Sequence, residues 1–233
     1  MIDNLKIFGF SGKIGVGKNY ISEQIFGNKL YNMGYNVHIL AVADQPKYEL
    51  GSRFSLIKDT NNFIEEMNDT FNELFVNKSA NTRTKLQIYG TDYCRNGGEL
   101  NIKDKFVLYN EASIWIKGLF LQIKNILSKS YNVKKDIFII TDVRFKNEAE
   151  FIHLMGGHII RIISPTRNNL KMLQEAKKNY MNEIDICNFI DRIKNHESET
   201  NLDTYQFDYI INNEPENINV YKEINDIVQI IFP

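Results

Sequence analysis

The stretch LKIFGFSGKIGVGK, residues 5–18, joins a short apolar run to a glycine-rich segment that ends in a lysine. The apolar run, residues 5–10, predicts a buried strand. Residues 12–18 fit the pattern G-x-x-x-x-G-K. Glycines allow backbone conformations in which successive N–H groups face one concavity and bind phosphate oxygens. We therefore predict a phosphate-binding loop directly after the first strand.

A helix that starts after Lys18 adds its positive N-terminal end to this loop, and the Lys18 ammonium supplies a cation for the β- and γ-phosphates of ATP. The residues predicted to bind the nucleotide here are Gly12, Lys13, Gly15, Val16, Gly17, Lys18 and Asn19. Asn19 stands where the common motif has Ser or Thr to hold Mg²⁺. An amide oxygen can ligate a hard cation, while water or a carboxylate elsewhere are open alternatives. A glycine-rich turn without a ligand is the alternative for the whole loop.

Outward from this loop, short apolar runs alternate with longer stretches of helical periodicity. This alternation predicts a three-layer α/β sandwich with a five-stranded parallel sheet covered on both faces. Further strands are expected at 37–43, 137–140, 158–163 and 209–211, and helices at 19–33, 59–78, 81–95, 105–130, 147–155 and 217–231. Ligands bind such sheets at the C-terminal ends of the strands.

The composition limits the class of protein. The 233 residues carry a net charge of −1 and are 43% hydrophobic, which suits a single domain, 1–233, with a helical insertion at about 44–130 and a lid at about 165–200. The balanced charge argues against a nucleic acid polymer as partner. No apolar run reaches the roughly 18 residues of a membrane span. The lack of a leader pattern and the two cysteines favour a cytoplasmic location.

A second polar motif, TDVRFKNEAE at 141–150, follows the predicted third strand. Asp142 is expected beside the phosphate loop, where it would hold Mg²⁺ through water or orient an acceptor phosphate. Its alternatives are a helix N-cap or a loop carboxylate whose hydrogen bonds are satisfied locally. Arg144 extends from the same loop as a catalytic candidate, and its alternative is an ion pair with Glu148 or Glu150.

With these motifs, the sequence resembles the deoxynucleoside monophosphate kinases of large DNA phages and viruses. The resemblance rests on residues 12–18, on LQIYGTD at 86–92 with Arg95, on 141–150, and on HESE at 196–199. Animal phosphomevalonate kinase is similar at a greater distance, and it also lacks Ser or Thr directly after the loop lysine. The resemblance implies a P-loop kinase-like fold with a five-stranded sheet, ATP and Mg²⁺, and transfer of the γ-phosphoryl group to a nucleoside monophosphate. A viral protein would then act in the host cytoplasm.

The resemblance also indicates where the acceptor binds. Residues 43–47 look like the acceptor loop of the family, with Asp44 and Lys47 as candidates, and a solvated lysine is the alternative for Lys47. Three further candidates lie at positions i, i+4 and i+12 of one predicted helix, a spacing that brings them to roughly one face of it. Two of them are arginines, whose guanidinium groups can form bidentate hydrogen bonds with a dianionic phosphate. These candidates are Arg83, Gln87 and Arg95, and two structural ion pairs are the alternative for the arginines. Trp115 matches a family position, with a core tryptophan as the alternative.

The segment after the fourth strand is expected to form the lid. A lid brings cations onto the transferring phosphates and excludes water, and Arg167 and Arg192 are the catalytic candidates in it. Residues 196–199 are predicted to form a turn with Ser198 as a cap. Asn213, after the fifth strand, is a candidate contact to the adenine, or else part of a turn.

Together these features predict direct in-line transfer from ATP without a covalent intermediate. Three alternatives are left open: another small phosphorylated acceptor such as phosphomevalonate, a non-catalytic ATP-binding regulator, and a nucleic-acid ATPase, which the neutral charge disfavours. The expected partners are nucleotides, with no membrane, and a homodimer is left open.

Overall fold

The computed structural model describes residues 5–44, 86–87, 91, 114–180 and 182–232. The chain divides into two compact units, one formed by Met1–Val42 with Leu119–Pro233 and the other by Ala43–Gly118. The first unit contains the sheet. The predicted helix at 59–78 lies outside the described residues, as does most of the one at 81–95, of which Leu86 and Gln87 are described as helical.

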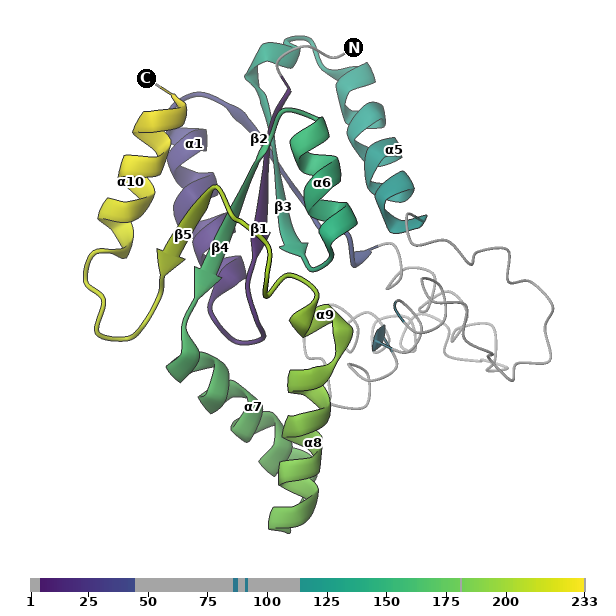
Figure 1. The fold of residues 1–233 in the computed structure, drawn as a ribbon. Helices are drawn as coiled ribbons and strands as arrows, with labels where there is room; N and C mark the ends of the chain where they lie inside the picture. The colour runs from purple at the N-terminus through teal and green to yellow at the C-terminus, as the bar shows by residue number, and fades with distance from the viewer. Residues whose placement is uncertain (1–4, 45–85, 88–90, 92–113, 181, 233) are drawn as a thin grey trace, which may run out of the picture. The chain divides into compact units, whose positions relative to one another are not determined.

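The described elements follow one another in alternating order along the chain (Figure 1). In chain order they are β1 (Lys6–Ser11), the π-helix η1 (Tyr20–Gly27), α1 (Asn28–Asn32), β2 (Asn36–Leu40), α5 (Ile114–Lys129), the 3₁₀ turn η4 (Val133–Lys135), β3 (Asp136–Val143), α6 (Lys146–Leu154), β4 (His158–Ile163), α7 (Pro165–Asn179), α8 (Glu183–Asn195), α9 (Glu197–Thr200), β5 (Tyr209–Asn212) and α10 (Val220–Ile231).

The five strands form one sheet in the order β2-β3-β1-β4-β5, and every neighbouring pair is parallel. The predicted fold class is therefore confirmed. β1 lies at the centre between β3 and β4, so the segment that follows Ser11 leaves the middle of the sheet at the C-terminal ends of the strands. Ser11 pairs in register with Val143 on one side and Arg161 on the other, which brings three loops to the same place.

Helices cover both faces of this sheet. Figure 1 shows α1 and α10 on one face and α6 and the C-terminal part of α5 on the other. On the first face Phe8 and Phe10 of β1 meet Phe26 of η1 edge to face, with ring centroids 5.1 and 5.2 Å apart. All three rings are buried. This apolar layer anchors the helix that follows the glycine-rich loop.

That helix differs from the expected α-helix in its winding. The predicted range 19–33 is helical from Lys18 to Asn32, and Gly34, at φ +84°, ends it. Residues 20–27 are wound as a π-helix, and the Asn28 N–H donates to the carbonyl of Glu23, five residues back. A Cβ on Gly27 would lie 3.2 Å from the Ser22 carbonyl oxygen, so the glycine leaves room for this wider turn.

Two strand ends also differ from expectation. β2 ends at Leu40 rather than at residue 43, and β3 continues to Val143, so Asp142 lies inside the strand near its end. The segment after β4 forms α7, α8 and α9. The predicted cap at Ser198 is wrong, because the side chain of His196 is the cap and accepts a hydrogen bond from the Ser198 N–H. Among the described helices, none is long and apolar enough to cross a membrane.

Candidate functional site

The loop between β1 and η1 has the backbone that the glycine pattern predicts. Gly15 and Gly17 have φ values of +78° and +85°, which side chains on L-residues disfavour. The helix begins directly afterwards, since the Ile21 N–H donates to the Gly17 carbonyl at 3.1 Å. The loop therefore leads straight into a helix N-terminus, which favours an anion.

Lys18 is the first helical residue, and its side chain is only 8% exposed. Its ammonium group forms no hydrogen bond or ion pair with any residue in the described ranges. The pKa of Lys18 is lowered to about 7, chiefly by burial and also by Arg144 and Arg161, while Asp142 and Glu199 oppose the shift. A buried, unpaired ammonium group is costly, so this position favours an anionic ligand that pairs with it.

Asp142, near the end of β3, and Arg144, just after it, both lie close enough to Lys18 to affect its pKa. One Asp142 oxygen accepts the Val42 N–H at 2.7 Å and so fixes the chain that follows β2. The alternative prediction, that Arg144 pairs with Glu148 or Glu150, is wrong for the side chain. Glu148 accepts the backbone N–H groups of Arg144 and Phe145, at 2.7 and 3.1 Å.

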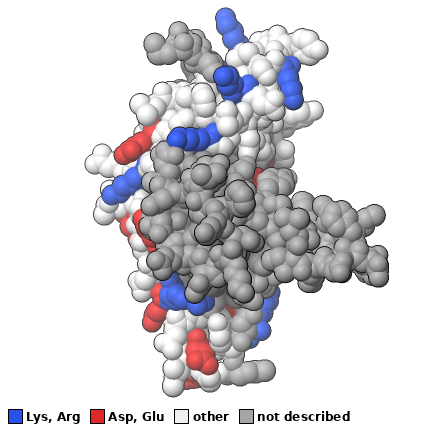
Figure 2. Space-filling model, turned by 90° about the vertical axis from the view of Figure 1, so that its right-hand side faces the viewer, with Lys and Arg blue, Asp and Glu red and all other residues white. Residues whose placement is uncertain are grey.

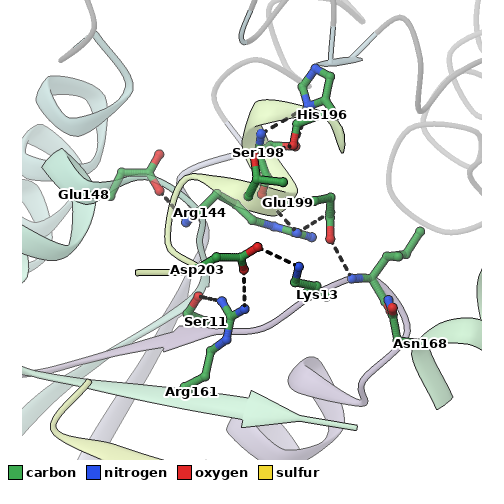
Figure 3. Close-up of polar contacts among 12 residues, drawn as sticks. Ser11, Lys13, Arg144, Glu148, Arg161, Asn168, His196, Ser198, Glu199 and Asp203 are labelled. Atoms are coloured by element: carbon green, nitrogen blue, oxygen red, sulfur yellow. Dashed lines mark hydrogen bonds and ion pairs between the residues drawn. The ribbon is translucent and has the colours of Figure 1, made fainter. Parts of the chain in front are cut away.

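The side chain of Arg144 pairs instead with Glu199 of α9 (Figure 3). Glu199 is 7% exposed, and its other oxygen accepts the Ile14 N–H of the loop at 3.0 Å. Arg144 Nη1 also lies 3.4 Å from the Ser198 carbonyl oxygen. One carboxylate thus joins α9, the end of β3 and the loop.

A second carboxylate, Asp203, bridges two cations beside the loop. It lies 2.9 Å from Lys13 Nζ and 3.4 Å from Arg161 Nη2, and Arg161 Nη1 donates to Ser11 Oγ at 3.0 Å (Figure 3). Burial lowers the pKa of Arg161, with Asp203 opposing the shift. Lys13 therefore points to Asp203 rather than into the centre of the loop.

The first helix after β4 packs against the outside of the loop. Asn168 Nδ2 donates to the Ile14 carbonyl at 2.5 Å. A Cβ on Gly15 would lie 2.4 Å from Lys171 Cβ, so only glycine fits under α7. Arg167, a lid candidate, is exposed, and its Nε donates to the Asn213 carbonyl at 2.8 Å.

The other nucleotide candidates lie on the loop or at its edge. Asn213 Nδ2 donates to the Val16 carbonyl at 2.8 Å, so its amide supports the loop backbone. Asn19 is exposed, and its Nδ2 donates to Glu23 at 3.1 Å. Arg192 is exposed on α8, with its guanidinium 5.5 Å from the centre of the Phe189 ring.

The acceptor candidates belong to the second unit. Lys47, Arg83 and Arg95 lie outside the described residues. Asp44 and Gln87 are half-buried, and both are helical. Trp115 is 2% exposed, which agrees with a core position.

Four residues near the loop had no predicted role: Arg161, Asn168, Glu199 and Asp203. A signal was present for Arg161, because it interrupts an otherwise apolar strand in a chain with only seven arginines. Glu199 lies in a stretch on which the family resemblance rests. Nothing in the local sequence distinguishes Asn168, since its partner Ile14 lies 154 residues away.

The residues around the loop fit a nucleoside triphosphate with Mg²⁺. The positive-φ glycines, the helix N-terminus and the Lys18 ammonium, which has no partner in the described part of the chain, suit phosphate oxygens. The Asp142 carboxylate near the end of β3 and the Asn19 amide oxygen after the loop are oxygen ligands of the kind that Mg²⁺ accepts. No group of three or more His, Cys, Asp or Glu residues able to hold a metal occurs in the described ranges.

Comparisons with known proteins give structural likeness alone. No family model and no curated protein matches the sequence. Among solved structures, dephospho-CoA kinase from Campylobacter jejuni aligns at 17% identity with a TM-score of 0.44, covering 98% of each chain. Shikimate kinase from Bacteroides thetaiotaomicron aligns at 12% identity with a TM-score of 0.40, covering 97% of this chain and 98% of that one. At these scores the likeness says nothing about the substrate of this chain.

Proposed function

We propose that this protein is an ATP-dependent kinase that transfers the γ-phosphoryl group to a nucleoside or deoxynucleoside monophosphate. The supporting observation is Lys18, an almost fully buried ammonium group at the start of the helix after the glycine-rich loop, with no partner among the described residues. The loop and Lys18 would bind the β- and γ-phosphates, and Asp142 and Asn19 would hold Mg²⁺ directly or through water.

Within this proposal, catalysis consists of positioning and charge stabilisation. The transition state of phosphoryl transfer spreads negative charge over the peripheral oxygens, so cations aimed at them lower the barrier. Mg²⁺ supplies part of that charge when bound. Lys18 and Arg144 supply the rest from the first unit, and Arg167 and Arg192 are the proposed lid contributors. Asp142 orients the acceptor or the metal, and no strong base is required.

The nucleoside monophosphate as acceptor rests on the family resemblance described above and on the residues proposed to hold it. These are Asp44, Lys47, Arg83, Gln87, Arg95 and Trp115. Two arginine forks and a lysine suit a dianionic phosphate, which every nucleoside monophosphate carries.

An acceptor panel tests this proposal. The full-length protein is incubated with ATP, Mg²⁺ and each ribo- and deoxyribonucleoside monophosphate in turn, with phosphomevalonate, dephospho-CoA and shikimate as comparison acceptors. We expect ADP formation that depends on at least one nucleoside monophosphate and that yields the matching diphosphate. Turnover of a comparison acceptor alone would assign the kinase to another substrate class. ATP binding without turnover on any acceptor would favour a regulator.

Surface charge gives no reason to prefer a nucleic-acid enzyme. On the face shown in Figure 2, blue and red side chains are interspersed over the described part of the surface. A nucleic-acid footprint needs a basic stripe or patch. The chain as a whole has 28 basic and 29 acidic side chains.

A further inference from the structure

Glu199 occupies an unusual place between the glycine-rich loop and Arg144. Its two carboxylate oxygens serve different partners, since one accepts the Ile14 N–H and the other accepts Arg144 Nη1 (Figure 3). The residue is 7% exposed. A buried carboxylate is costly unless its oxygens are paired, so these two donors define where it lies.

We propose that Glu199 is a positioning residue that holds the Arg144 guanidinium and the phosphate loop in one arrangement, with the free edge of Arg144 turned to the anionic substrates. This inference deepens the proposed kinase function and rests on it.

The described hydrogen bonds of Arg144 use only one nitrogen of its guanidinium group. Nη1 is taken by the Glu199 carboxylate and lies 3.4 Å from the Ser198 carbonyl oxygen. Nε and Nη2 form no hydrogen bond with a residue that the structure describes. One edge is therefore held by α9, and the other keeps its donors for a phosphate oxygen.

Two carboxylates fix Arg144, one through its backbone and the other through its side chain. Glu148 accepts the backbone N–H groups of Arg144 and Phe145 and so sets the turn between β3 and α6. A long side chain on a fixed backbone still has several rotamers, and holding one of them costs conformational entropy. The ion pair with Glu199 selects one of these rotamers, which Glu148 does not do.

On the loop side, Ile14 is held from two helices. Glu199 of α9 accepts its N–H at 3.0 Å, and Asn168 of α7 donates to its carbonyl at 2.5 Å. A displacement of α9 would therefore disturb both the backbone of the loop at Ile14 and the side chain of Arg144. This shared connection makes Glu199 a link between the two groups that act on phosphate.

A double-mutant cycle tests whether Glu199 acts through Arg144. The variants are Glu199→Gln, Arg144→Gln and both together, and Glu197→Gln, an exposed carboxylate on the same helix, is the matched control. Glutamine keeps the length and an acceptor for the Ile14 N–H but removes the charge. We expect Glu199→Gln to lower kcat or raise the acceptor KM by about 10- to 100-fold, with little change in the double variant relative to Arg144→Gln alone.

A spectroscopic measurement tests the same point without turnover. In protein labelled with ¹⁵N-arginine, restricted rotation should give Arg144 separate Nη signals, assigned by their loss in Arg144→Gln. We expect these signals to be lost in Glu199→Gln and kept in Glu197→Gln.

The two measurements separate the possible failures. If the wild-type protein transfers to no acceptor, the proposed function fails, and the arginine spectra still decide whether Glu199 holds Arg144. Arg144 signals that persist in Glu199→Gln would overturn the positioning role. So would a double variant whose rate loss equals the product of the two single losses, because Glu199 would then act independently of Arg144. A loss of thermal stability without any kinetic effect would assign Glu199 a structural role only.

Discussion

Lys18 combines burial with the absence of a partner in the described structure, and this combination costs stability. With its pKa lowered to about 7, Lys18 binds its proton less tightly in the folded chain than in the unfolded chain. At pH 7 and below, the folded protein therefore carries the penalty of a buried cation. Such a penalty is typical of a group retained for function rather than for folding.

We predict that Lys18→Met raises the free energy of unfolding at pH 7 by more than about 1 kcal/mol, because the buried charge is removed and the apolar stem is kept. The same variant should lose phosphoryl transfer by about 100-fold or more. Urea unfolding measures the free energy of unfolding, and steady-state kinetics measure the rate of phosphoryl transfer. Lys134→Met, an exposed lysine on η4, is the control for a general effect of replacing a lysine. A variant that is less stable than wild type would contradict this account of Lys18.

The pH dependence of kcat/KM for ATP follows from the same group. This quantity reports the free enzyme, in which the pKa of Lys18 is about 7. Only the protonated ammonium attracts phosphate, so kcat/KM should fall tenfold for each pH unit above that value. A flat profile between pH 7 and 9, with the fold intact, would show that Lys18 keeps its charge in the free enzyme.

The segment from β1 to η1 shows how much of the site the sequence could predict. A local pattern predicts the loop and the helix after it, because a glycine-rich turn after a central strand allows few backbone conformations. It also predicts where Asp142 and Arg144 lie, since ligands bind at the C-terminal ends of such strands. The partners Glu199, Asp203 and Asn168 come from segments more than 150 residues away, and no local pattern pairs them with the loop. The π-winding of η1 depends on packing around Gly27 and was equally beyond a pattern of periodicity.

Gly15 gives a prediction about the contact between the loop and α7. Gly15 and Gly156 both have φ +78°, but a Cβ on Gly15 would lie 2.4 Å from Lys171 Cβ, whereas one on Gly156 would meet nothing within 4 Å. Gly156→Ala therefore measures the backbone strain alone, about 1–2 kcal/mol. We expect Gly15→Ala to cost more stability than this and to weaken ATP binding as well, measured by calorimetry. Equal effects of the two variants would mean that α7 does not press on the loop.

Asp136, at the other end of β3, gives a prediction about stability. It is buried and accepts hydrogen bonds from His38 at 2.8 Å, from Asn36 at 3.3 Å and from Ser130. Burial alone would raise its pKa, but these hydrogen bonds outweigh burial and lower it. A carboxyl whose folded pKa is lowered stabilises the fold above its unfolded value of about 4, and this contribution is lost as the pH falls below it.

The free energy of unfolding of Asp136→Asn should accordingly lie below that of wild type at pH 6, and the gap should narrow toward pH 3. Unfolding in urea at several pH values measures it, with Asp191→Asn on the exposed side of α8 as control. A gap that is independent of pH would place the stabilisation in packing rather than in the charge.

In the molecule as a whole, the number of strands in the sheet and their parallel direction agree with the prediction from alternating apolar runs and helices, whereas the strand order was not predicted. The two central strands β1 and β3 were predictable because each is a nearly continuous apolar run that is buried almost throughout. The acceptor side was not predictable to the same degree. Its candidate residues fall between positions 44 and 115, where the family resemblance, rather than a pattern with a single structural meaning, indicated them.

The most direct test of the central claim is a single-turnover transfer experiment. ATP labelled in the γ-phosphoryl group is mixed with excess protein, Mg²⁺ and the full set of nucleoside and deoxynucleoside monophosphates, and the labelled products are separated. The account predicts label in at least one nucleoside diphosphate with wild type, and label left in ATP with Lys18→Met. Label that stays in ATP, or appears only as inorganic phosphate, with wild-type protein that binds ATP would contradict it.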